Sequence, residues 1–201
     1  MQCDDPLVEI IASEELLAGR LCAVVERTKL QLERCHLAQV TPVVIRVTND
    51  PHPSGLMGHF SMMGNRIELL PPGGIDKVLD AQSAYRKIPA EEFFDSIIVH
   101  ELTHALFLET NCGLETCLAG HEYIAYAMQL DALSSESRKA FLEALPAEVP
   151  VDLAWFSSDR LHETPEVFAA GAWRHFAQPD KGCAFVGALL SGESTFPSVF
   201  E

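Results

Sequence analysis

Apolar residues recur with a helical period through the centre of the chain. Their spacing gives one wide apolar face, formed by Phe93, Phe94, Ile97, Ile98, Leu102, Ala105, Leu106 and Leu108. Pro89 and the acidic pair Glu91 and Glu92 suit a first helical turn, and residues 111–113 (Asn-Cys-Gly) are typical of a helix end. The pattern predicts a central helix from residue 89 to about residue 110.

Similar patterns predict helices on both sides of this segment. One covers residues 13–33, with Ser13 as its N-cap and Glu14 and Glu15 near the positive end of the helix dipole. Others are predicted over 75–85, 116–132, 165–177 and 182–190, and from Ser134 to just before Pro146. Residues 146–150 are interpreted as a linker, and 151–156 as a short extended piece.

Strand signals are confined to the first part of the chain. Residues 41–48 are rich in β-branched side chains and end at Asn49-Asp50-Pro51. Two short strands, over 57–62 and 66–70, are joined through Gly64-Asn65 as a hairpin and stopped by residues 71–74. The elements predict one α+β domain over 1–201, with a strand region (39–72), central helices (89–133) and a helical C-terminal part (134–201).

Composition narrows the function classes. The chain has 201 residues, 48% of them hydrophobic, and a net charge of −15 with 14 Lys and Arg. No basic patch is visible and no apolar run could cross a bilayer, so nucleic-acid binding and a membrane span are not expected. The first residues lack a basic and a hydrophobic signal region, so no signal peptide is expected within them; the segment fits a mature N-terminus equally well.

The six cysteines give information about the cellular compartment of the protein. An even number is compatible with disulfides in an oxidising environment, so the chain is expected to be periplasmic or secreted, with the cytoplasm as the alternative. Cys112 and Cys117 bracket a short loop and are candidates to pair with each other.

The most specific chemical signal lies within the central helix. His100, Glu101 and His104 form the pattern His-Glu-x-x-His. Residues four apart share a helix face, so both imidazoles can reach one Zn²⁺ at roughly 2.0–2.1 Å. Glu101, about 100° further round the helix, can act as general base on a water activated by the metal.

A catalytic zinc usually has three protein ligands and one open position. Two neighbouring residues at the start of the next predicted helix, His121 and Glu122, are candidates for the third ligand. The spacing alone leaves both open.

Residues His100–His104, followed within twenty residues by Gly120-His121-Glu122-Tyr123-Ile124-Ala125-Tyr126, resemble the gluzincin zinc metallopeptidases. The resemblance covers about residues 93–130 and is strongest to small, uncharacterised bacterial metallopeptidases. It implies Glu122 as the third zinc ligand, with His121 replacing an Asn that is usual in the family. It also implies a zincin-like fold in which an edge strand borders the cleft, and a peptide or protein substrate bound by β-augmentation.

Other residues have weaker claims. Peptide hydrolysis calls for an oxyanion donor, and its candidates are Tyr123, Tyr126, His162 and His175, while His121 is a candidate to support a ligand. Met57, Met62 and Met63 are expected beneath the hairpin, and Trp155, Phe156, Trp173 and Phe176 in the C-terminal core. His52 and His59 are expected at the surface, with a position facing the cleft as the alternative. Two other functions remain open: a non-catalytic zinc-stabilised binding domain, and a zinc amidase acting on a non-peptide substrate.

Overall fold

The fold is described from a computed structural model that covers residues 3–50, 52, 55–106, 114–146 and 151–196, with the side chains of 114–117 left out. A four-stranded mixed sheet and a larger set of helices make up this part of the chain. The predicted α+β class is confirmed.

The strands β1 (Val8–Ile11), β2 (Val43–Val47), β3 (Gly58–Ser61) and β4 (Arg66–Leu69) lie in the order β1-β2-β4-β3. β2 is parallel to both β1 and β4, whereas β3 runs antiparallel to β4 and forms one edge of the sheet. Alternate side chains are buried against helices, as a sheet with one covered face requires: Val8, Ile10, Val43, Ile45, Ile67 and Leu69.

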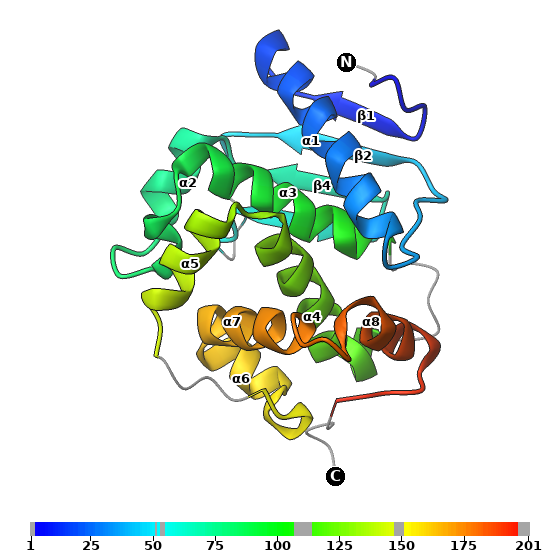
Figure 1. Ribbon diagram of the computed structural model, residues 1–201. Coiled ribbons are helices and arrows are strands. Elements are labelled where there is room, and N and C mark those ends of the chain that lie inside the picture. The colour runs from blue at the N-terminus through cyan, green and yellow to red at the C-terminus, as the bar shows by residue number, and fades with distance from the viewer. Residues whose placement is uncertain (1–2, 51, 53–54, 107–113, 147–150, 197–201) are drawn as a thin grey trace.

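Helices α1 (Glu15–Glu33) and α3 (Ala90–Leu106) pack together beside the sheet (Figure 1). Helix α4 (Leu114–Ala132) packs on α3 and leads into a second helical layer. That layer contains α6 (Ser158–Glu163), α7 (Pro165–Phe176) and α8 (Gly182–Ser191). The smaller elements are α2 (Pro72–Val78), α5 (Ser135–Glu143) and the 3₁₀ turns η1 (Ala84–Lys87) and η2 (Leu153–Trp155).

The hairpin prediction is confirmed, because β3 and β4 pair through a turn in which Gly64 and Asn65 have positive φ angles of 89° and 46°. Strand β1 and helix α6, of four and six residues, were not predicted. Three further predictions lie outside the described residues. They are the end of the central helix near residue 110, most of the 146–150 linker, and the pairing of Cys112 with Cys117.

Several local predictions were wrong. Helix α1 begins at Glu15, with Glu14 rather than Ser13 at its N-cap position. Residues 71–74 start α2 instead of only ending the hairpin, because proline suits a first turn; the predicted 75–85 helix is replaced by α2 and η1. Residues 151–156 contain a 3₁₀ turn, for which Asp152 accepts a hydrogen bond from the Ala154 N–H.

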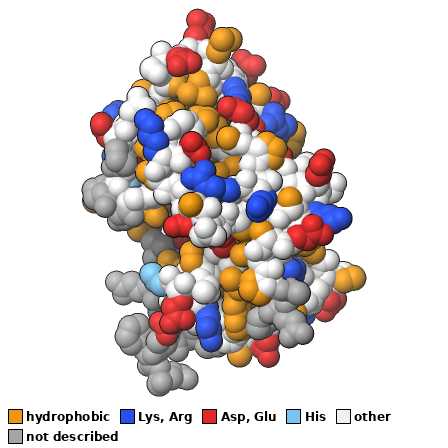
Figure 2. Space-filling view, turned by 90° about the vertical axis from the view of Figure 1, so that its left-hand side faces the viewer, with side chains coloured by type: hydrophobic (Ala, Val, Ile, Leu, Met, Phe, Trp, Pro, Cys, Tyr) orange, Lys and Arg blue, Asp and Glu red, His pale blue; other side chains and the backbone are white. Residues whose placement is uncertain are grey.

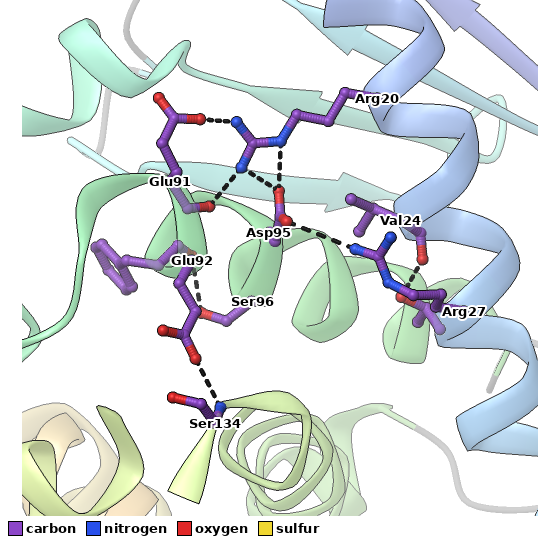
Figure 3. Close-up of polar contacts among 10 residues, drawn as sticks. Arg20, Val24, Arg27, Glu91, Glu92, Asp95, Ser96 and Ser134 are labelled. Atoms are coloured by element: carbon purple, nitrogen blue, oxygen red, sulfur yellow. Dashed lines mark hydrogen bonds and ion pairs between the residues drawn. The ribbon is translucent and has the colours of Figure 1, made fainter. Parts of the chain in front are cut away.

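Helix α3 is held on two sides by polar contacts (Figure 3). From α1, the guanidinium of Arg20 donates to Asp95 Oδ1 at 2.7 and 3.1 Å and to the backbone carbonyl of Glu91 at 2.8 Å. On the opposite side, the Glu92 carboxylate accepts a hydrogen bond from the Ser134 N–H at 2.6 Å, at the start of α5. The helix that bears the His-Glu-x-x-His pattern is therefore fixed in position by its neighbours.

Two disulfides are present among the described residues. Cys3 pairs with Cys22, and Cys35, just after α1, pairs with Cys183 on α8, which is 148 residues away in sequence. The second bond links the sheet-bearing half to the C-terminal helices. No helix in the described ranges has the length and apolarity needed to traverse a lipid bilayer.

Charged side chains are mixed on the face of the molecule shown in Figure 2, where Lys and Arg alternate with Asp and Glu. No continuous basic area appears on this face, in keeping with the excess of acidic residues.

Candidate metal centre

Three side chains predicted as metal ligands converge where α3 and α4 pack together. The Nε2 atoms of His100 and His104 are 3.1 Å apart, as expected for residues one helical turn apart. The Glu122 carboxylate reaches them from α4, with 3.4 Å separating Oε2 from His100 Nε2 and Oε1 from His104 Nε2. These side chains are only 11%, 15% and 19% exposed, so they form a largely buried cluster.

The donor atoms lie close enough together to hold a single metal ion, and two imidazoles with a carboxylate are a ligand set that suits zinc. Zinc ligands at roughly 2.0–2.1 Å in a tetrahedron lie about 3.3 Å from one another, close to the 3.1 Å between the two imidazole nitrogens and to the 3.4 Å from each nitrogen to a different oxygen of Glu122. A cation between these two nitrogens, or a proton carried by one of them, satisfies both lone pairs. Among the described residues, no other His, Cys, Asp or Glu joins this group, so the set leaves one tetrahedral position open.

A hydrogen-bond chain orients His100 toward this centre. Its Nδ1 lies 3.1 Å from Gln129 Oε1, and the Gln129 amide nitrogen donates to Ser96 Oγ at 3.1 Å. Ser96 in turn donates to the Phe93 carbonyl at 2.7 Å, which fixes the direction of the chain. His100 therefore carries its proton on Nδ1 and presents the lone pair of Nε2, the form that binds metal.

Gln129 was not predicted as a site residue. It lies seven residues after Glu122, which is two turns along the same face of α4. That spacing was the available signal.

The electrostatics of Glu122 suit a ligand. Burial alone would raise the pKa of this carboxyl, but His104 and His100 outweigh it through charge and hydrogen bonds and hold the pKa well below its usual range. Glu122 is therefore an anion next to both imidazoles.

Tyr126, one turn further along α4, packs its ring edgewise against His100 with 4.6 Å between the ring centroids.

Glu101 is buried beside the cluster without belonging to it. Its carboxylate accepts a hydrogen bond from the backbone N–H of Phe60 on β3. Burial, together with the charge of nearby Glu122, raises the pKa of Glu101 to about 7, although His104 and the Phe60 N–H act in the opposite direction. A carboxyl with such a pKa is suited to accept and release a proton near neutral pH.

Gly58 allows β3 to approach Glu101 closely. A Cβ at this position would lie 2.6 Å from Ile97 Cγ2 and 2.9 Å from Glu101 Oε1, closer than real Cβ contacts. Only glycine fits here without displacing α3 or the strand.

The cluster opens into a cavity of about 790 Å³ between β3, α3, α4 and the start of α7. Of the other predicted site residues, His121, Tyr126 and His162 line it. Further lining residues are Leu56, Met57, Gly58, His59, Phe60, Ser61, Met62, Met63, Tyr85, Phe93, Ile97, Leu118, Gln129, Leu161 and Pro165.

Tyr85 was not predicted as a site residue. Its buried hydroxyl has no hydrogen-bond partner among the described residues.

Two candidate oxyanion donors lie elsewhere. The Tyr123 hydroxyl is 2.6 Å from His175 Nδ1, and the pair is enclosed by Phe156, Phe185 and Phe196 rather than facing the cavity. Tyr123 points away from Glu122 because consecutive helical residues are about 100° apart. This position leaves both side chains out of reach of a substrate in the cavity.

The surface and core predictions had mixed outcomes. His59 lines the cavity, with its ring 4.6 Å from that of His52. Met62 and Met63 are exposed rather than packed beneath the hairpin, because they lie at the β3–β4 turn. Phe156 is fully buried as predicted, while Trp155, Trp173 and Phe176 are partly buried against the same core.

Comparison with known proteins places the chain in a family. Residues 8–199 match a family of unknown function (DUF6639), and the chain belongs to that family. No curated protein and no solved structure matches it.

Proposed function

We propose that this member of the DUF6639 family is a zinc-dependent peptidase with a zincin-like arrangement of its active site. The observation that supports this most directly is the spacing of 3.1–3.4 Å among the donor atoms of His100, His104 and Glu122. A metal-stabilised binding domain would need a closed four-ligand site. The nearest candidate, His121, does not belong to the donor group.

In the proposed hydrolysis, each residue of the site has a separate role. Zinc, when bound, supplies Lewis-acid chemistry that makes water a stronger nucleophile and polarises a carbonyl group. Glu101 accepts the proton of the attacking water and passes it to the leaving amine. The Phe60 N–H and the close approach of Gly58 hold the Glu101 carboxylate in position, and Gln129 fixes the orientation of His100.

The edge strand β3 offers a surface for an extended substrate. The Leu70 N–H bonds to the Met57 carbonyl at 2.9 Å, so in this antiparallel register the backbone groups of His59 and Ser61 also face β4. The backbone groups of Gly58 and Phe60 then face away from the sheet. A peptide lying beside β3 would pair as an added strand with the Gly58 N–H and carbonyl and with the Phe60 carbonyl, since the Phe60 N–H is bonded to Glu101.

The disulfides support a proposed location outside the cytoplasm. Cys3–Cys22 and Cys35–Cys183 would persist in an oxidising compartment such as the periplasm or the extracellular space.

The function is tested by combining metal analysis with Glu101→Gln. Protein purified without added zinc is expected to contain about one zinc per chain by elemental analysis. Glu101→Gln should keep that zinc but lower kcat/KM on a peptide library roughly 10²–10⁴-fold, because it removes the proton acceptor.

Glu33→Gln is the matched control, since Glu33 is an exposed residue at the end of α1 and should not affect either readout. Absence of zinc, or equal turnover by wild type and Glu101→Gln, would contradict the proposal.

A further inference from the structure

The lip of the cavity carries exposed apolar side chains. Leu56, Met62 and Met63 line the cavity and are 44%, 53% and 88% exposed. All three come from β3 or its flanking segments, so they gather beside the edge strand. Other exposed large apolar residues, such as Leu16 and Leu30 on α1, are not part of this lip. An apolar group beside a cavity is typical of a surface that binds a ligand.

The described lining of the cavity offers no permanent cation to a substrate carboxylate. It includes no Lys and no Arg; its basic side chains are histidines, of which His59, His121 and His162 lie outside the metal centre, and its only carboxylates are Glu101 and Glu122. Both acids lie at the metal centre, where they offset the positive charge of a bound ion. An acidic side chain entering the cavity would lose its hydration without gaining a permanently charged partner.

The absence of Lys, Arg and unengaged carboxylates from the described lining also limits how the free ends of a polypeptide could be recognised. Recognition of a free C-terminus usually relies on a cationic side chain or on a set of backbone donors. Recognition of a free N-terminus needs a carboxylate that is not already engaged. Among the described lining residues there is neither a permanent cation nor a spare carboxylate, which favours a segment from the interior of a polypeptide.

From this lining we infer that the cleft binds internal, uncharged, apolar segments of polypeptides, with Leu56, Met62 and Met63 covering the side chains of the bound segment. The inference rests on the proposed peptidase function and specifies its substrate class. Methionine is unbranched and polarisable, so two methionines at the lip can adapt to apolar side chains of different shape. The preference is therefore for apolar character rather than for one residue type.

Binding to zinc-loaded Glu101→Gln protein tests this inference without requiring turnover. The probes are two capped octapeptides, acetylated and amidated at their ends, with Gly-Gly flanks. One has the centre Phe-Leu-Leu-Phe, and in the other Asp replaces both Leu. Calorimetry is expected to show binding of the apolar peptide at least about tenfold tighter than that of the acidic one.

The lip is tested by Met63→Glu and Met63→Gln in the same background, with Leu16→Glu as the matched control. Met63 and Leu16 are 88% and 90% exposed, so none of these changes should disturb folding. Met63→Glu is expected to weaken the apolar peptide about tenfold and Met63→Gln by a smaller factor, whereas Leu16→Glu should change its Kd less than about twofold.

Equal affinity for the two peptides, or equal effects of Met63→Glu and Leu16→Glu, would overturn the inference. Failure of the proposed function would be distinct from this outcome. In that case the apolar peptide would still bind selectively, while wild-type protein would leave it uncleaved.

Discussion

Helix α4 contributes a residue to each of two histidine clusters, which differ in whether the protein itself supplies partners for their polar atoms. In one, Glu122 lies beside His100 and His104, and the three donor atoms face each other next to a cavity. In the other, the hydroxyl of Tyr123 is 2.6 Å from His175 Nδ1 inside a shell of aromatic rings. The residues that separate the two clusters, Glu122 and Tyr123, are adjacent in sequence.

The difference shows which property marks a ligand site. Both clusters are buried, so burial of a polar residue does not distinguish them. A phenol and an imidazole complement each other as donor and acceptor, which makes the Tyr123–His175 pair complete within the protein. When both imidazoles turn a lone pair toward the carboxylate, all three groups are acceptors, and a bound cation then completes the set.

The largest expected effect concerns the first cluster. Glu122→Ala removes one of the three proposed ligands and should weaken zinc binding roughly 100-fold or more, since loss of supporting residues around metal sites already costs 10–100-fold. A competition titration with a chelator of known affinity measures this loss. Tyr123→Phe, one residue further on, should leave the zinc affinity unchanged.

The assignment of the third ligand would be reversed by one result. His121→Ala is expected to retain zinc, because His121 lies outside the donor group even though it lines the cavity. Sharper zinc loss in His121→Ala than in Glu122→Ala would transfer the ligand role to His121.

An intermediate effect is expected for the second cluster. Tyr123→Phe deletes the hydroxyl that pairs with His175 and leaves a buried imidazole nitrogen unsatisfied, which should lower the free energy of unfolding by about 1–3 kcal/mol. Urea denaturation followed by circular dichroism measures the change. Unaltered stability would mean that the pair does not contribute as a core element.

The smallest expected effect is the pH dependence of that pair. Burial lowers the pKa of His175 below its ordinary value of 6.5; the charge of Lys181 adds to this effect and that of Asp180 opposes it. Below pH 6.5 the unfolded chain therefore binds more protons than the folded chain. The free energy of unfolding should decrease as pH falls through 6.5 and level off below the folded-state pKa.

Urea denaturation of metal-free wild type and His175→Gln, at about pH 7.5 and about pH 5.5, isolates this contribution. The two proteins differ only at residue 175, so the difference between their slopes belongs to His175. A steeper pH dependence in His175→Gln than in wild type would contradict the assignment.

Features of the site that depend on residues close in sequence could be predicted, whereas those that depend on distant segments could not. The approach of His100 to His104 depends on one helical turn, and the hairpin on the Gly64-Asn65 turn, so both could be predicted from local spacing. The buried position of Tyr123 and the proximity of Gly58 to Glu101 depend on contacts between segments distant in sequence. No local pattern carries that information.

By itself, the sequence determined the α+β class, the central helix with two imidazoles on one face, and a following helix with acidic and histidine candidates. Only the tertiary structure decided that Glu122 rather than His121 faces those imidazoles, that Gln129 orients His100, and that β3 lies against Glu101. The physical reason is that helix geometry is fixed by neighbouring residues. The rotation of α4 about its axis, by contrast, is set by its packing on α3 and α7.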